Sequence, residues 1–203
     1  MECAPVIGAP VFRLYGWTEP AGSFGYSQHY AEIERATMLR PLVRRPTGGG
    51  LVPHDADWTY SLAFPPEHYW YHLKAVESYE RAHQWIAEAF ARIDVKTTLS
   101  PGTPKALPGQ CFIGSERFDV LWFGKKIAGA AQRRTKTGLL IQGSIQPPPI
   151  SLARMDWQTA MCKSAENNFD VEWVPLQAEG VLADTTERLR DSKYSQDSFN
   201  KSR

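Results

Sequence analysis

Three successive glycines between two arginines and a histidine form the segment of this sequence that is best suited to chemistry. Residues 44–55 read RRPTGGGLVPHD, so Arg45 precedes Gly48, Gly49 and Gly50, and His54 follows them. Glycine permits positive φ and lets a ligand approach main-chain N–H groups closely. Such N–H groups beside cations suit a negatively charged or carbonyl-bearing ligand. The segment fits a glycine-rich hairpin turn with a solvated basic flank equally well, and by itself it leaves both interpretations open.

A lysine followed by small residues forms a second candidate. Lys126 stands at the start of a predicted strand that continues through Gly129, Ala130 and Ala131. Small side chains on a strand leave room for another body, and an apolar ligand chain is one possibility. A lysine at the mouth of such a slot can hold a carbonyl oxygen or a phosphate. The competing interpretation is an ordinary surface lysine beside alanine-rich packing.

The third candidate is Cys111, which follows a Pro-Gly-Gln segment and precedes Phe112. Fifteen positions before Lys126, its thiolate could be a nucleophile stabilised by that cation. Burial is the commoner fate of a free cysteine, and we expect it for Cys3 and Cys162.

Hydrophobic patterning predicts the elements that must position these residues. We expect a three-stranded antiparallel meander in the second half of the chain and a long helix covering the sheet, with His68, His72 and His83 at its surface or cap. No βαβ unit surrounds the glycines, which argues against a Rossmann fold. The predicted class is α+β, a mixed, largely antiparallel central sheet with flanking helices. The predicted strands are 11–15, 42–45, 58–64, 118–123, 126–133, 139–145 and an edge strand 171–176; the predicted helices are 31–39, 67–93, 151–165 and 184–199.

Composition narrows the possible functions. The 203 residues carry 23 basic and 22 acidic side chains, so net charge gives no reason to expect nucleic acid or an anionic membrane as a partner. No run of about 18 apolar residues suggests a membrane span. Three cysteines without C-x-x-C spacing argue against a disulfide framework or a zinc site, and we expect a reducing cytoplasm and no metal. The length predicts one domain over 1–203.

With these residues in view, the sequence resembles the lipoate/octanoate attachment family. That family comprises lipoate–protein ligases and octanoyl-carrier-protein transferases, and it shares its class II synthetase-like catalytic fold with biotin–protein ligase. The glycine segment resembles the motif R-R-x-x-G-G-G-x-V-x-H-D, and residues 124–133, GKKIAGAAQR, resemble G-[KR]-K-[IV]-x-G-x-A-Q-R. Residues 11–28 resemble the family's opening strands. The matching blocks span roughly 11–145.

The resemblance implies roles for the candidate residues. Arg45, the three glycines and His54 would line the acyl and carbonyl end of a pocket, and Lys126 would contact the acyl carbonyl. Residues 111–119 resemble the transferase segment C-F-x-x-x-x-x-[YF]-[DE], in which the cysteine carries an acyl thioester.

The implied activity is transfer of an octanoyl or lipoyl group to a lysine of a lipoyl domain or a glycine-cleavage H-type protein. Octanoyl carrier protein would be the donor, and no cofactor would be needed. The alternative is an ATP- and Mg-dependent ligase in which Lys126 holds a lipoyl-adenylate. A second alternative is a non-catalytic lipoyl-binding subunit that needs a partner.

Three departures from the family pattern affect these expectations. The family usually begins with a helix bearing an N-M-A-x-D-E-type segment, which residues 1–10 do not match, so we expect a truncated start or a partner that covers the core. Pro53 replaces a residue that is usually apolar but not proline. We expect no C-terminal accessory domain, and with Cys111 this favours the transferase over the ligase.

Overall fold

Side-chain alternation along the central strands determines how the layers of this protein stack. The computed structural model describes residues 1–102 and 115–202. On β5 (Trp58–Phe64), the even-numbered side chains from Trp58 to Phe64 are buried in the main core, while Thr59, Ser61 and Ala63 face the opposite side of the sheet. A strand that alternates in this way presents two different surfaces to two different layers.

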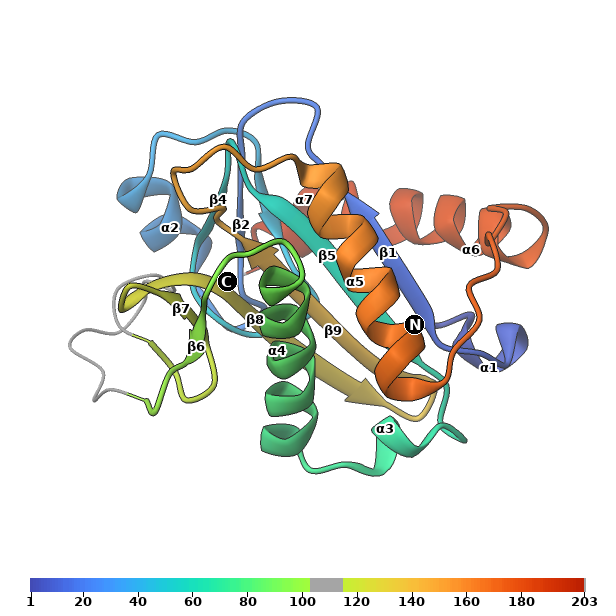
Figure 1. Cartoon of the computed structure of the whole chain (residues 1–203). Helices are drawn as coiled ribbons and strands as arrows, with labels where there is room; N and C mark the ends of the chain where they lie inside the picture. The colour runs from blue at the N-terminus through green and yellow to red at the C-terminus, as the bar shows by residue number, and fades with distance from the viewer. Residues whose placement is uncertain (103–114, 203) are drawn as a thin grey trace.

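The main sheet has six strands in the order β1-β5-β9-β8-β7-β6, and every neighbouring pair is antiparallel. Its strands β7, β8 and β9 form the predicted meander. Figure 1 shows the sheet as a twisted layer behind two long helices. Besides β5, the strands are β1 (Val11–Tyr15), β6 (Thr98–Leu99), β7 (Val120–Trp122), β8 (Lys125–Thr135) and β9 (Gly138–Ile145).

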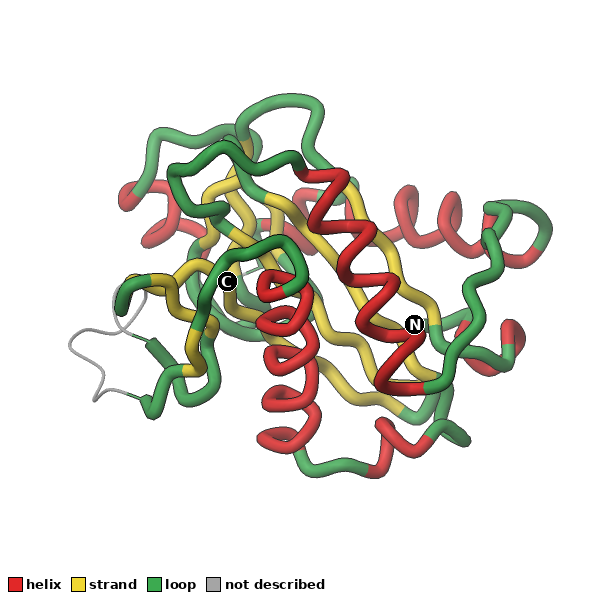
Figure 2. The backbone as a smooth tube through the Cα atoms, in the orientation of Figure 1, coloured by secondary structure: helices red, strands yellow, loops and turns green. Residues whose placement is uncertain are grey.

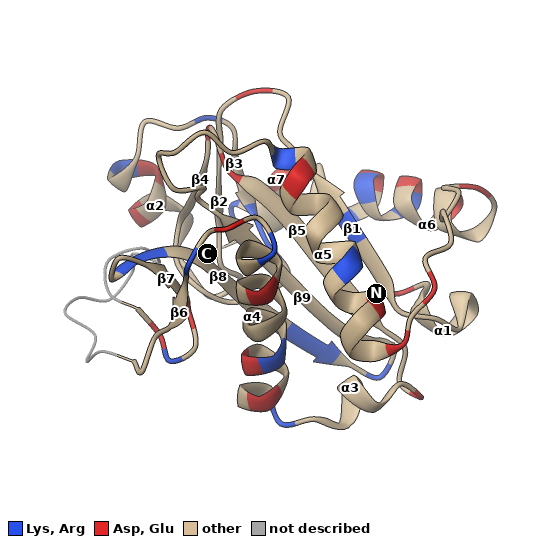
Figure 3. Cartoon of the chain, viewed as in Figure 1, with Lys and Arg blue, Asp and Glu red and all other residues tan. Residues whose placement is uncertain are grey.

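Two helices, α4 (Ala75–Ala91) and α5 (Arg154–Phe169), cover one face of this sheet (Figure 2). Their contact includes a buried hydrogen bond from Trp85 Nε1 to the Met161 carbonyl, 2.8 Å long. Trp157 and Phe90 are fully buried between the helices and the sheet. Both basic and acidic residues occur along the two helices (Figure 3). This arrangement confirms the predicted α+β class with helices on a largely antiparallel sheet.

A second, smaller layer lies against the other face. It contains a three-stranded sheet in the order β3-β2-β4, in which β2 and β3 are parallel. Phe24, Ile33 and Leu42 form its own small core. The elements of this layer and the connecting helices are α1 (Ala4–Ile7), β2 (Ala21–Phe24), α2 (Tyr30–Ala36), β3 (Leu42–Arg44), β4 (Val52–His54), α3 (Tyr69–His72), α6 (Val181–Leu189), a π-helical turn (Arg190–Tyr194) and α7 (Asp197–Asn200).

Some sequence predictions were wrong in detail. The predicted helix 67–93 is two helices, because the chain is extended at Leu73 and Lys74. The predicted edge strand 171–176 has no regular secondary structure, and helix 184–199 is divided into α6, the π turn and α7. Among the described residues, no helix combines the length and the apolar character needed to cross a bilayer.

The prediction for His83 was also wrong, because this histidine is fully buried. Its Nδ1–H donates to the Tyr79 carbonyl over 2.9 Å, and its Nε2 finds no partner within the described part of the chain. Burial lowers the pKa of His83 from 6.5 to about 4. His68, in contrast, caps α3 as expected by accepting a hydrogen bond from the Trp70 N–H.

This burial predicts a specific loss of stability in mild acid. Between pH 6.5 and about 4 the unfolded chain binds a proton at His83, whereas the folded chain does not. The contribution of His83 is therefore fully present above pH 6.5 and falls, by up to about 3 kcal/mol, as the pH approaches 4. We expect urea unfolding of His83→Phe to depend less on pH over this range than that of the wild type. Exposed His72→Gln is the matched control, and equal pH slopes for wild type and His83→Phe would contradict the expectation.

Candidate active site

A cavity of about 890 Å³ lies between the second face of the main sheet and the smaller layer. The cross-strand neighbours Thr59, Ser144 and Gly129 form one row of its floor, and Ser61, Gln142 and Ala131 form the next. The terminal segments contribute to the opposite wall, with Ile7, Leu182 and Leu189 among the lining residues. The cavity thus combines a floor of mostly small side chains with a wall to which the terminal segments contribute apolar side chains.

The glycine segment forms one side of this cavity, between β3 and β4. Arg45 fixes its shape, because Nη2 donates to the carbonyls of Gly48 and Gly50, 2.8 Å in each case. Gly49 has a φ of +87° and lines the cavity. A Cβ on Gly25 would collide with the backbone of Gly49, so both segments depend on the absence of side chains.

The preceding arginine serves a different purpose. The Arg44 side chain is 1% exposed and donates through Nη1 to the carbonyls of Tyr26 and Gln28, 2.7 Å each. Its Nε donates to the carbonyl of Phe199 in α7. Arg44 therefore ties the closing helix to the smaller sheet, while Arg45 shapes the glycine loop.

Lys126 belongs to a buried polar cluster at the β7–β8 end of the cavity. Its Nζ lies 2.8 Å from Asp119 Oδ2, with the lysine side chain 9% exposed and the aspartate fully buried. Asp119 also accepts hydrogen bonds from the Tyr79 hydroxyl and the Glu116 N–H. Burial, reinforced by the nearby Asp119 charge, raises the pKa of Tyr79, so the phenol remains a donor. The cluster holds a positive charge at a fixed place in the cavity wall.

Gly129 provides the space that this lysine needs. A Cβ at position 129 would lie 2.7 Å from Lys126 Cε and 2.9 Å from Nζ. Any side chain there would displace the ammonium group. The Ala130 N–H donates to the Tyr79 hydroxyl, which links the small-residue strand to the same cluster.

A second polar cluster surrounds His54. Its Nδ1 lies 2.9 Å from Asp57 Oδ2, and its Nε2 lies 2.7 Å from Ser23 Oγ. Trp17 stacks on the imidazole with a ring separation of 4.1 Å. Asp57 Oδ2 accepts two further hydrogen bonds, from the hydroxyls of Thr59 and Ser144. The imidazole is therefore held from both nitrogens and from one face.

The cavity brings together most of the residues that the sequence singled out. Those that line it are Arg45, Gly49, His54, Lys126, Gly129, Ala130 and Ala131. Gly48 and Gly50 stand behind the lining as acceptors for Arg45. Cys111 lies outside the described residues.

Sequence reasoning did not single out Ser23, Asp57, Tyr79 or Asp119 as site residues. Ser23 and Asp119 both fall inside the blocks that resemble the family, so a signal for them existed. Asp57 was not recognised as the partner of His54, because Asp55 directly follows His54 in the sequence; Asp55 is exposed in the structure. Tyr79 lies on a long helix and carries no local signal.

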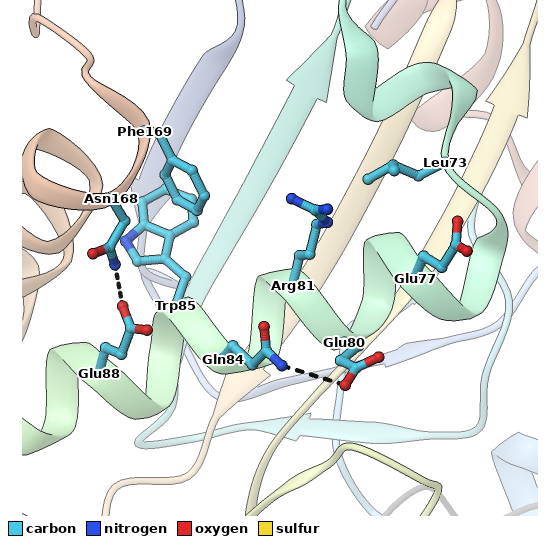
Figure 4. A pocket seen from close by; sticks show the side chains of 9 residues that line it. All are labelled: Leu73, Glu77, Glu80, Arg81, Gln84, Trp85, Glu88, Asn168 and Phe169. Atoms are coloured by element: carbon cyan, nitrogen blue, oxygen red, sulfur yellow. Dashed lines mark hydrogen bonds between the residues drawn. The ribbon is translucent and has the colours of Figure 1, made fainter.

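A second hollow, of about 540 Å³, lies on the outer surface between α4 and the end of α5. Figure 4 shows it lined by the carboxylates of Glu77, Glu80 and Glu88, with Asn168 donating to Glu88. A groove rimmed by acidic side chains does not suit an apolar or anionic ligand. The interlayer cavity is therefore the candidate active site.

Solved structures of low sequence identity share this fold. A lipoate-protein ligase A bound with ATP superposes with a TM-score of 0.75 at 18% identity, covering 95% of this chain and 85% of that one. A T. acidophilum protein described as a lipoate protein ligase, with bound lipoic acid, gives 0.76 at 17% identity, covering 96% and 86%. The fold is that of the lipoate protein ligases.

The sequence itself identifies the family. This chain belongs to the lipoyl protein ligase A/B catalytic domain family, whose model matches residues 5–146.

Curated relatives with higher identity are octanoyltransferases. Octanoyltransferase LipM of Halalkalibacterium halodurans is 34% identical over 148 residues, which cover 67% of this chain and 54% of that protein. LipM of Carboxydothermus hydrogenoformans is 31% identical over 145 residues, covering 68% and 53%. This chain thus spans about half the length of the curated relatives it matches.

Proposed function

We propose that this chain transfers an octanoyl or lipoyl group from a carrier thioester to a specific lysine of a lipoyl domain. The observation that carries the proposal is the position of Lys126 beside Gly129 in a cavity that the glycine loop also lines. The similarity to LipM octanoyltransferases supports transfer rather than ATP-dependent ligation.

The cavity suits an acyl chain with its carbonyl near Lys126. Burial of an eight-carbon chain contributes roughly 5 kcal/mol, at about 0.8 kcal/mol per methylene. The wall of Ile7, Leu182 and Leu189 offers an apolar surface for the tail. The Lys126 ammonium would then stabilise the negative charge that develops on the carbonyl oxygen during each acyl transfer.

Two successive transfers complete the reaction. In the first, the Cys111 thiolate attacks the carrier thioester, a new C–S bond forms, and the carrier leaves as a thiol after taking up a proton. In the second, the neutral amine of the acceptor lysine attacks the Cys111 thioester, a C–N bond forms, the C–S bond breaks, and the Cys111 sulfur leaves as a thiol that carries the proton lost by the amine. The first step exchanges one thioester for another and the second converts a thioester into a more stable amide, so neither step requires ATP or a metal ion.

The implied partners are an acyl carrier protein as donor and a lipoyl domain or H-type protein as acceptor. Cys3 and Cys162 are free thiols, which fits a reducing cytoplasm. The alternative activity, ligation of free lipoate, would need ATP and Mg.

One incubation tests the proposal. The chain is mixed with an apo lipoyl domain and either octanoyl carrier protein alone or lipoate with ATP and Mg, and the acceptor is weighed by mass spectrometry. We expect octanoyl addition in the first mixture without nucleotide. Modification only in the second mixture would identify a ligase, and modification in neither would favour a binding subunit.

A further inference from the structure

The hydroxyl of Tyr79 connects the helix layer to the Lys126 cluster. Tyr79 belongs to α4, which covers the face of the sheet opposite the cavity, and its side chain does not line the cavity. The hydroxyl donates a hydrogen bond to Asp119 Oδ1 and accepts one from the Ala130 N–H over 3.3 Å. It therefore joins a helix, a strand and the carboxylate that binds the Lys126 ammonium.

The course of the sheet explains why Ala130 uses this hydroxyl. The pairing of β7 with β8 reaches only as far as Ala128, so β7 has already left the sheet where Ala130 lies. A main-chain N–H away from water needs an acceptor, and here the acceptor comes from the helix. The first turns of α4 cover this edge of β8, because Ser78 Oγ also donates to Gln132 Oε1, 3.0 Å away. Tyr79 is thus fixed on the strand as well as on the carboxylate.

Donors from three elements determine the orientation of the Asp119 carboxylate. Oδ2 lies 2.8 Å from Lys126 Nζ and accepts the Glu116 N–H over 2.7 Å, whereas Oδ1 accepts the Tyr79 hydroxyl. A Cβ on Gly129 would lie 2.9 Å from Lys126 Nζ and 3.1 Å from Asp119 Oδ1, so both charged groups lie over this glycine. A rotation of the buried carboxylate would therefore move the ammonium relative to the cavity.

We propose that Tyr79 is a positioning residue for acyl transfer, and that its hydroxyl holds Asp119 in the orientation that presents the Lys126 ammonium to the acyl carbonyl. Without the hydroxyl, Asp119 Oδ1 and the Ala130 N–H each lose a partner inside the protein. The carboxylate then satisfies Oδ1 by turning further toward the ammonium, which draws the charge into the cavity wall. This inference rests on the proposed transferase function. Tyr79 does not touch the substrate and acts only through Asp119 and Lys126.

Tyr79→Phe removes the hydroxyl and keeps the ring, which packs on His83 with a centroid separation of 4.1 Å. With octanoyl carrier protein and apo lipoyl domain as substrates, we expect kcat to fall about tenfold, a part of the loss expected for the lysine itself, and KM to change by less than about twofold. The matched control is Tyr71→Phe. Its hydroxyl donates to the Thr135 carbonyl over 3.1 Å, at the other end of the same strand, and its loss is expected to leave kcat unchanged.

A double-mutant cycle separates this role from a purely structural one. Rates are measured for Tyr79→Phe, Lys126→Met and the double variant, each divided by the folded fraction obtained from urea unfolding. If Tyr79 acts through Lys126, the double variant is as slow as Lys126→Met and no slower. A further tenfold loss in the double variant, or a wild-type rate for Tyr79→Phe, overturns this inference and leaves the proposed function standing. A wild-type chain that transfers no octanoyl group overturns the proposed function, and the inference with it.

Discussion

Cys111→Ser is expected to reduce octanoyl transfer by about 10⁴-fold or more, and to eliminate the acyl-enzyme seen by mass spectrometry. A thiolate is an intrinsically strong nucleophile and forms even near neutral pH when cations stand close by. A serine hydroxyl in the same place lacks both properties. It also forms an oxyester, from which the lysine amine displaces a poorer leaving group.

Cys162 supplies the control for this experiment. It is half-buried on α5, and burial raises the pKa of its thiol, which keeps the sulfur protonated and unreactive. We expect Cys162→Ser to retain full transfer and the acyl-enzyme. Full transfer by Cys111→Ser would rule out the covalent route, and a new requirement for ATP in the same assay would identify adenylate chemistry.

Local patterns were sufficient to predict most of the main sheet. The strands at 11–15 and 58–64 match β1 and β5, and β8 and β9 fall where the small-residue and aliphatic runs placed them. Burial alternates along most of β5, and a short turn joins β8 to β9, so local sequence determines much of their course. The long helix predicted to cover the sheet corresponds mainly to α4, which lies on one face of it.

The strand pairings that could not be predicted from the sequence are those that depend on residues far away in the chain. β2 is only four residues long, and its parallel pairing with β3 joins segments about 20 positions apart. Residues 171–176 have apolar side chains typical of a strand, yet they lie beside β1 without joining the sheet; Trp173 packs on Phe12 instead. Tertiary packing determines whether such segments pair, and a short stretch of sequence carries no information about that packing.

The candidate active site was likewise predictable only in part. Motif residues such as Lys126 and His54 could be named from sequence because their neighbours are distinctive. Their partners could not be assigned, because Asp119, Tyr79, Ser23 and Asp57 reach them only after the chain has folded. His83 was placed at the surface for the same reason: the pattern of α4 gave no indication that a histidine would be enclosed next to the Lys126 cluster.

The Lys126 cluster gives the second large prediction. Lys126→Met preserves the length of the side chain but removes the charge that would face the acyl carbonyl oxygen. Loss of one such stabilising group costs about 10² to 10³ in turnover. We expect a decrease of that size in both half-reactions, measured as acyl-enzyme formation and as transfer to the lipoyl domain. Lys125→Met, at the exposed neighbouring position, is the matched control and is expected to retain activity.

This substitution also leaves Asp119 buried without its cation, which would destabilise the fold by about 3–5 kcal/mol. A drop in activity could then reflect unfolding instead of chemistry. The double variant Lys126→Met/Asp119→Asn separates the two effects, because it removes both charges, although its single amide oxygen can accept from only one of the two Asp119 donors, the Tyr79 hydroxyl and the Glu116 N–H. We expect urea unfolding to show that the double variant regains part of the lost stability while transfer remains low. If activity returned together with stability, Lys126 would be needed only to neutralise Asp119. Other groups would then have to stabilise the oxyanion of the transfer reaction, and the N–H groups of the glycine loop, which lines the same cavity, are the first candidates.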